Sequence, residues 1–216
     1  MTDTTPSAKR GPYARSRKRR ADIADAVLRL VDEHGHDRVT TALVARESGV
    51  PEATVLYHFA GKEHLLVAGM VRADELAVRE AGVEEEDVRL DLDELRRAVA
   101  PGPVEERRLR LYLTLKGLSA TPGSPAAAYF HDRTEHSVRI FARLVERRQR
   151  DGLAHPGLDP EQTARQISAL FDGLTMMRIT NADVPVDDLL ADGVRRLTGE
   201  NWMRARALLD GPEVGL

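Results

Sequence analysis

The sequence contains no cysteine among its 216 residues. A disulfide framework, a thiolate metal site and a cysteine nucleophile are therefore excluded. No apolar run approaches the roughly 20 residues that a membrane-spanning helix requires. The polar, basic N-terminus also lacks the apolar core of a secretory signal. These absences lead us to expect a cytoplasmic protein with no membrane partner.

Catalytic motifs are also missing, because no G-x-G-x-x-G, Walker loop or G-x-S-x-G occurs. The segment HDRTEH, residues 131–136, is the best candidate for a metal site, but its spacing differs from H-E-x-x-H. We interpret it as a charged helix surface and expect no metal, no other cofactor and no enzymatic activity. Aromatic residues make up only 4% of the chain, so a large flat ligand is not specially indicated. The four side chains of that segment that could suggest a metal site are His131, Asp132, Glu135 and His136.

Positive charge is concentrated at the N-terminus. The first 20 residues hold seven basic side chains and one acid, whereas the whole chain has a net charge of −3. A basic arm on an acidic body indicates contact with a polyanion through one end only. A solvating, disordered tail is the alternative, and the two interpretations are compatible. The basic residues are Lys9, Arg10, Arg15, Arg17, Lys18, Arg19 and Arg20.

Apolar residues recur at helical spacing along most of the chain, with glycine and proline at the breaks. The one exception is RLRLYLTLKGL, residues 108–118, in which leucine alternates with other residues as in a strand. No second strand is available to pair with it, and leucine favours helices, so we predict a helix there too. The expected helices are 16–34, 42–48, 52–58, 62–80, 91–100, 104–120, 124–151, 160–180, 186–197 and a short one after Trp202.

Two short helices with a break between them form the most informative segment, residues 42–58. Two closely crossing helices need a small residue at the contact, which Ala45 supplies, and the turn needs a positive φ, which Gly49 supplies. Val44, Val50 and Val55 are expected to face inward. The outer face of the second helix then presents short or planar polar groups that suit a major groove.

The run TTALVARESGVPEATVLYHFAGKEHLL, residues 40–66, is more specific than a bare helix-turn-helix. Its threonine-rich cap, its Gly-Val turn, its aromatic-His-Phe end and its Lys-Glu-x-Leu resemble the TetR family of bacterial transcriptional regulators, over residues 17–77. The resemblance implies an all-α fold in which an N-terminal three-helix DNA-binding domain precedes a larger helical domain for ligand binding and dimerisation. We expect a disordered basic arm at 1–15, the helix-turn-helix domain at 16–61 with its motif at 40–59, and the helical body at 62–216.

The same resemblance assigns DNA contacts residue by residue. The two threonines would touch phosphate, the first residues of the reading helix would face base edges or backbone, and the tyrosine would read a base or stack on the sugar-phosphate. The histidine and the lysine would grip phosphate. The predicted contacts are Thr40, Thr41, Glu52, Ala53, Thr54, Tyr57, His58 and Lys62.

Two positions depart from the family pattern. Leu56 stands where the family usually has a tyrosine that donates to a phosphate, so one anchor is lost. Glu52 is an acid where a neutral or basic residue is more common. It could accept from a cytosine amino group, but we favour a solvated charge that matches the helix dipole.

For the body, the resemblance implies a homodimer that pairs through the helices at about 160–180 and 186–200. We expect Ile167, Phe171 and Leu174 to form an exposed stripe suited to that interface, with packing inside the chain as the alternative. A small-molecule effector of unknown identity is expected in the body, and the operator should be a palindrome in double-stranded DNA. The candidate pocket residues are Tyr112, Phe130, Phe171 and Met177, each of which could instead be plain core.

The expected function is a DNA-binding transcriptional regulator, with a ligand-responsive repressor favoured over an activator. A protein-interaction module that uses the same helix-turn-helix is one alternative. A helical-bundle enzyme is a weaker one, because it needs an acid/base or metal constellation that the sequence does not offer.

Overall fold

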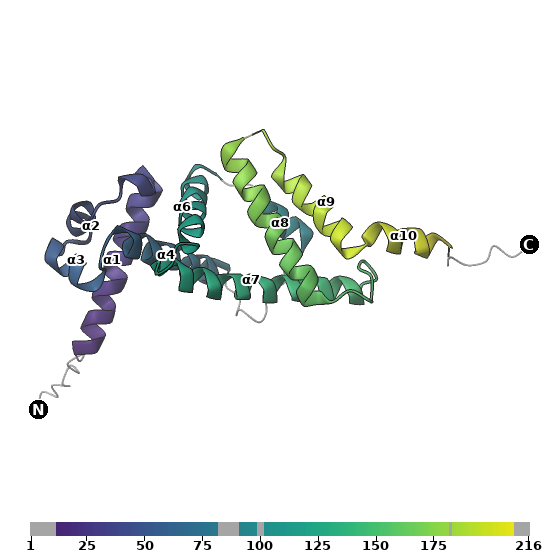
Figure 1. Ribbon diagram of the computed structural model, residues 1–216, viewed down its shortest axis with the longest axis horizontal. Helices are drawn as coiled ribbons and strands as arrows, with labels where there is room; N and C mark the ends of the chain where they lie inside the picture. The colour runs from purple at the N-terminus through teal and green to yellow at the C-terminus, as the bar shows by residue number, and fades with distance from the viewer. Residues whose placement is uncertain (1–11, 82–90, 99–101, 182, 210–216) are drawn as a thin grey trace, which may run out of the picture.

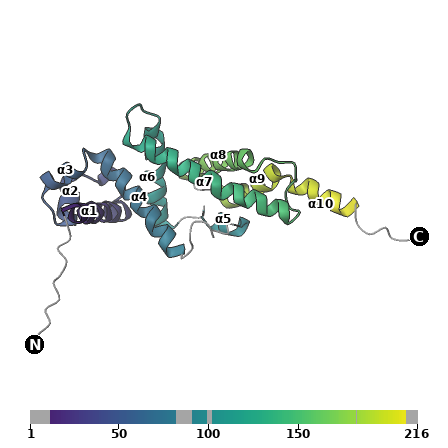
Figure 2. The ribbon, with the colours of Figure 1, turned by 90° about the horizontal axis from the view of Figure 1, so that it is seen from below.

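The computed structural model describes residues 12–81, 91–98, 102–181 and 183–209, and these form helices joined by short connections. Figure 1 shows an elongated arrangement with α1 to α4 at one end and α10 at the other, and Figure 2 gives the same order. The all-α prediction is confirmed. Every described helix is too short or too polar to span a lipid bilayer. The helices are α1 (Pro12–His34), the 3-10 turn η1 (His36–Arg38), α2 (Thr41–Ser48), α3 (Glu52–His58), α4 (Lys62–Ala81), α5 (Leu92–Ala98), α6 (Pro103–Ser119), α7 (Pro125–Arg150), α8 (Pro160–Thr180), α9 (Val186–Thr198) and α10 (Glu200–Leu209).

The helix boundaries follow local chemistry. Asp159 caps α8 by accepting from the Gln162 backbone N–H at 2.9 Å, which satisfies one of the unpaired donors at a helix N-terminus. The expected start of α1 at Ser16 was wrong, because the helix begins at Pro12. Proline suits a first helical position, where its missing N–H costs nothing. Residues 1–11 of the predicted arm lie outside the described residues.

The alternating segment 108–118 lies inside α6, so the predicted helix is confirmed. Leu111, Tyr112 and Leu115 are buried there. The helix contacts α1, α4, α7 and α8. Burial on several sides explains why its sequence lacks the single apolar stripe of a surface helix.

Buried residues form two hydrophobic clusters. The first contains residues from each of the helices α1, α2, α3, α4 and α6 and from the start of α7. The second contains residues from α5, the rest of α7, α8 and α9. The predicted body begins at residue 62 and includes α4, yet Leu65, Leu66 and Met70 of this helix belong to the first cluster. Gly69 permits the close approach, since an added Cβ would lie 2.7 Å from Cγ1 of Val27 on α1. The helix that leads into the body is therefore packed directly on the N-terminal helices.

The stripe expected on the surface of α8 faces inward. Ile167 is fully buried, Leu174 is 7% exposed, and Phe171 packs against the second cluster. The prediction of an exposed interface stripe was wrong for these residues. The reason is that α8 packs between α7 and α9, which cover the face that carries them.

Candidate nucleic-acid interface

The turn between α2 and α3 has the predicted geometry. Gly49 ends α2 with φ 67° and ψ 24°, the left-handed conformation that side chains other than glycine rarely adopt. The Val50 N–H donates to the Ala45 carbonyl at 3.1 Å. Val44 and Val55 are fully buried and Val50 is half-buried. The turn therefore holds α3 in one orientation, with its opposite face toward solvent.

The two threonines at the start of α2 have different hydrogen-bonding partners. The Thr40 hydroxyl oxygen accepts from the Leu43 backbone N–H at 3.2 Å, so its own proton remains available for a phosphate. The Thr41 hydroxyl instead donates to Oε1 of Glu52 at 2.5 Å. A phosphate at Thr41 would have to compete with this carboxylate.

The exposed face of α3 carries most of the predicted base-reading side chains. Tyr57 is 84% exposed, Ala53 is exposed one turn earlier, and Thr54 is half-buried. Glu52 lies in the first turn of α3, where its charge complements the helix dipole. Leu56 is 47% exposed, so this apolar side chain stands beside Tyr57 on the same surface. An exposed leucine there suits a thymine methyl group better than a phosphate.

His58 ends α3 beside two arginines of α1. Its ring is half-buried, and burial, followed by the positive charges of Arg20 and Arg19, lowers its pKa below the ordinary value of 6.5. At neutral pH the imidazole is therefore uncharged and offers a phosphate one N–H but no cation.

Arg20 is a residue of this site that the motif did not identify. Its guanidinium donates to the His58 backbone carbonyl at 2.7 Å and lies 4.5 Å from the centre of the Phe59 ring. It satisfies a carbonyl at the end of α3, where helical partners run out, and fastens α3 to α1. The basic run identified Arg20 as a cation. Its contact with His58 could not be predicted from a local sequence pattern, because the two residues are 38 positions apart.

Lys62 begins α4, as predicted, and its side chain is exposed. Its ammonium donates to the Asp37 carbonyl at 2.7 Å, so it also fastens α4 to the connection between α1 and α2. An ammonium has three donors, and two remain for other acceptors.

The first turns of α1 extend this surface. Tyr13, Arg15, Arg17 and Arg19 are exposed, and Figure 1 shows this half of α1 projecting past α3. Lys18 is paired with Asp22 at 3.1 Å. The predicted cations Lys9 and Arg10 lie outside the described residues.

The candidate pocket residues of the body do not form one group. The Tyr112 and Phe130 rings meet edge to face with centroids 5.3 Å apart. Phe171 packs in the second cluster, and Met177 is 48% exposed. Only the first two residues are brought together.

Tyr112 and Phe130 belong to a polar and aromatic group that the sequence did not reveal. The Tyr112 hydroxyl donates to Asp172 at 2.7 Å, and Lys116 donates to the same carboxylate at 2.5 Å. The Tyr129 hydroxyl donates to Asp74 at 2.5 Å, and its ring meets Phe130 at 4.9 Å. Burial, followed by Asp172, raises the pKa of Tyr112 well above its ordinary value, so this hydroxyl stays a donor.

The segment 131–136 behaves as a charged helix surface. Its Glu135 pairs with Arg165 at 3.1 Å, which lowers the pKa of that carboxyl. Within the described residues, no group of three or more histidine, aspartate or glutamate side chains is arranged to hold a metal ion.

Comparison with known proteins matches this geometry to one family. The family profile described as bacterial regulatory proteins, tetR family, matches residues 23–68. The transcriptional regulator BetI of Agrobacterium fabrum is 29% identical over 172 residues, which cover 72% of this chain and 74% of that protein. BetI of Brucella suis is 26% identical over 178 residues, covering 77% and 83%.

Solved structures have the same fold. A transcriptional regulator from Saccharomonospora viridis in complex with choline gives a TM-score of 0.63 at 22% identity, covering 86% of this chain and 97% of that one. The multidrug binding protein EbrR complexed with ethidium gives 0.60 at 24% identity, covering 83% and 98%. The helix-turn-helix geometry, the matched profile and these relatives lead to one conclusion: residues 23–68 are similar to the DNA-binding region of the tetR family, and the chain is a DNA-binding transcriptional regulator.

Proposed function

We propose that this regulator is a ligand-responsive repressor that binds a palindromic operator as a homodimer. The observation that carries the proposal is the exposed face of α3 beside the cationic first turns of α1. Cations that meet phosphate supply affinity and register, and side chains that reach base edges supply specificity. The described surface offers both at one end of the molecule.

On the DNA, we assign separate roles to the residues of this surface. Thr40 and Lys62 would contact phosphate at the starts of α2 and α4, where backbone N–H groups favour an anion. Tyr57, Ala53 and Thr54 would face the major groove. His58 would donate a hydrogen bond to a phosphate, and Thr41 would also contact a phosphate. Glu52 would accept the hydrogen bond of the Thr41 hydroxyl.

The homodimer is proposed to form through α8 and α9, but on a different face from the stripe first expected. Exposed positions on α8 follow one helical face that includes Ala169, Gly173, Met176 and Met177, and α9 adds Leu189, which is 41% exposed. Small residues allow a close helix approach, and exposed apolar ones favour burial against a partner. Two α3 helices about 34–36 Å apart would then match successive major grooves.

The effector is proposed to bind at the aromatic group of Tyr112, Tyr129 and Phe130. Rings beside carboxylates recognise organic cations, and two similar structures hold choline or ethidium. Lys116 already lies 5.6 Å from the centres of the Tyr112 and Phe130 rings, so an organic cation would take its place. Release from DNA requires that this ligand bind a conformer with the wrong α3 spacing more tightly.

A gel shift with the duplex upstream of the protein's own gene tests the proposal. We expect a salt-dependent complex of two chains per palindrome, and its loss on adding choline or ethidium at saturation. A sedimentation measurement gives the number of chains. A chain that ignores every genomic duplex at low ionic strength would instead support the protein-interaction module, and increased transcription on DNA binding would identify an activator.

Replacing Lys62 by alanine should weaken binding to all DNA sequences alike. We expect the slope of log affinity against log salt to fall by about one unit for each Lys62 that meets a phosphate. Lys62→Arg, which keeps the charge, is the control and should retain the slope. An unchanged slope in the alanine variant would contradict a phosphate contact by Lys62 and would leave it only the structural role of its bond with the Asp37 carbonyl.

DNA affinity should rise as the pH falls from about 8 to about 5.5. The pKa of His58 is lowered in the free protein, and a neighbouring phosphate would raise it, so the complex binds more protons than its components. The added affinity is present at low pH and is lost as the pH rises through the pKa of the bound form. Anisotropy titrations should show about a threefold or larger gain that His58→Gln reduces, and an identical pH profile in this variant would contradict the phosphate role.

A further inference from the structure

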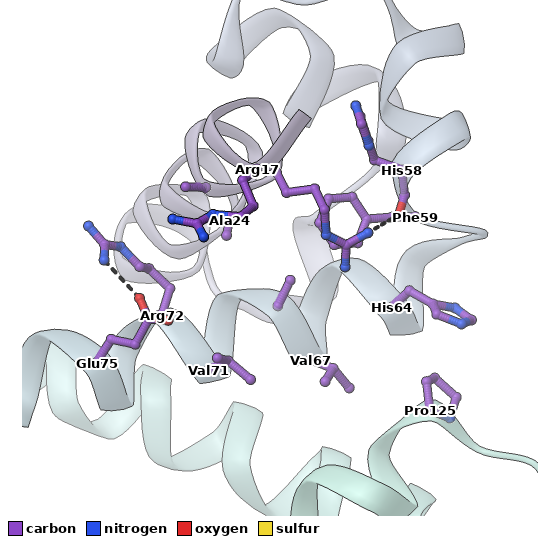
Figure 3. A pocket seen from close by; sticks show the side chains of 13 residues that line it. Arg17, Ala24, His58, Phe59, His64, Val67, Val71, Arg72, Glu75 and Pro125 are labelled. Atoms are coloured by element: carbon purple, nitrogen blue, oxygen red, sulfur yellow. Dashed lines mark hydrogen bonds and ion pairs between the residues drawn. The ribbon is translucent and has the colours of Figure 1, made fainter. Parts of the chain in front are cut away.

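A groove of about 520 Å³ runs between α1 and α4 at the DNA-binding end of the molecule. Figure 3 shows Ala24 of α1 and Val67 and Val71 of α4 along it, with Phe59 between the two helices and Pro125 of α7 nearby. Its volume is that of a small-molecule site. We call it the α1–α4 groove, and it is separate from the aromatic group of the body.

The floor of the α1–α4 groove is apolar. Phe59 and Ala24 are buried beneath it, Val67 and Ala68 are half-buried, and Val71 is 38% exposed. These side chains belong to helices that pack together in the first hydrophobic cluster, so the floor is preformed. Apolar side chains that remain open to water at a concave surface favour an apolar ligand.

The rim of the groove is cationic at one end only. Arg72 at the far end bonds to Asp25 at 2.5 Å and to Glu75 at 2.9 Å, which balances its charge. At the near end Arg20 bonds to a backbone carbonyl, and no described carboxylate pairs with either Arg20 or Arg17. The groove thus combines an apolar floor with two guanidinium groups that pair with no described carboxylate, of which Arg20 lies at the end nearest α3.

We propose that the α1–α4 groove binds a small amphipathic organic anion. Its apolar body would lie on Val67, Ala68 and Val71, and its acid group would meet Arg17 and Arg20, whose planar guanidinium groups suit a carboxylate or sulfonate. A DNA phosphate would use the same cations but would gain nothing from the apolar floor, which favours the amphipathic ligand.

Such a ligand has a direct consequence for DNA binding. Arg20 bonds to the end of α3 at His58, and Arg17 lines the same groove, so an anion there removes positive charge from the surface that faces phosphate. Ligand and DNA should therefore oppose each other, and each should lower the affinity of the other by the same factor. This makes the groove a second regulatory input, independent of the effector proposed for the body.

The probe for the experiment is 1-anilinonaphthalene-8-sulfonate, a fluorescent apolar ring system with one sulfonate. Titration of the full chain should show saturable binding of one molecule per chain at the groove. N-Phenyl-1-naphthylamine, which has a similar ring system without the acid group, should bind at least about tenfold more weakly. Equal affinity for the two compounds would overturn the proposal that Arg17 and Arg20 bind the acid group of the ligand.

Two matched pairs of variants locate the probe. Val71→Glu places an acid on the floor, whereas Val78→Glu places one on an exposed position of the same helix outside the groove. Arg17→Ala removes a rim cation, whereas Arg79→Ala removes an exposed arginine of α4 outside it. The first member of each pair should lose about tenfold or more in probe affinity and the second less than twofold. Equal effects within the pairs would overturn the proposal, and since all four positions are exposed, the melting temperatures should be retained.

The DNA arm of the experiment measures the coupling. Saturating probe should lower the affinity of the wild-type chain for duplex DNA at least about threefold, and should leave Val71→Glu unaffected. Probe binding at the groove with unchanged DNA affinity in the wild type would overturn the antagonism.

Discussion

Alanine at position 57 is expected to lower affinity for the operator about 100-fold while changing affinity for random duplex DNA by less than about threefold. Tyr57 is 84% exposed on α3, and its ring meets the neighbouring His58 ring with centroids 5.2 Å apart, so the folded chain loses little packing when Tyr57 is shortened. A base-edge contact contributes about 1–3 kcal/mol of discrimination. A dimer would lose that contribution twice, because both half-sites carry the same contact.

The comparison of two DNA sequences makes this prediction specific. Anisotropy titrations at one fixed salt concentration should use the selected operator and a scrambled duplex of equal length. Tyr57→Phe retains the ring and removes the hydroxyl, so it separates stacking from hydrogen bonding. An equal loss on both duplexes would mean that Tyr57 contacts the backbone and carries no sequence information.

Replacing Glu200 by alanine is expected to cost about 3–5 kcal/mol of unfolding free energy. Its side chain is 3% exposed and pairs with Arg148, which is 8% exposed, with Arg204 at 2.5 Å and with Arg195 at 3.8 Å. The Nε of Arg148 is buried without a hydrogen-bond partner. Without Glu200, the chain would bury an arginine with no compensating charge at the junction of α7, α9 and α10.

Thermal unfolding at one fixed protomer concentration measures this cost. We expect the midpoint to fall by about 10 °C, in line with the entropy of unfolding of a chain of this size. Asp192→Ala is the matched control, because its pair with Arg196 is an exposed helical one and such pairs contribute little. Pairing Glu200→Leu with Arg148→Met should restore much of the stability, and a single alanine variant as stable as the wild type would refute the structural role.

The helix-turn-helix was accessible from the sequence because its determinants are local. Gly49 and the inward valines act within a few residues of one another, and Thr40 caps α2 through the Leu43 backbone N–H. Residues 108–118 show the limit of local pattern, since the alternating leucines suggested a strand, whereas the missing partner strand and the helix preference of leucine favoured a helix. Packing on several sides of α6 accounts for that pattern.

Contacts between distant residues decided the rest of the candidate site. Arg20 reaches the His58 carbonyl across 38 positions, and Lys62 reaches the Asp37 carbonyl across 25. The stripe of Ile167 and Leu174 was assigned to the surface because periodicity identifies an apolar face but does not say which neighbour covers it. The same ambiguity put Met177 among pocket residues, although it lies on the surface.

The sequence by itself determined the class of fold, the helices and the family, because glycine, proline and capping residues act on the backbone beside them and the motif is contiguous. The tertiary structure alone decided which face of α8 is open, which cations lack a carboxylate, and where an apolar groove meets them. Those properties depend on helices far apart in the chain packing against one another, and no single segment encodes that geometry.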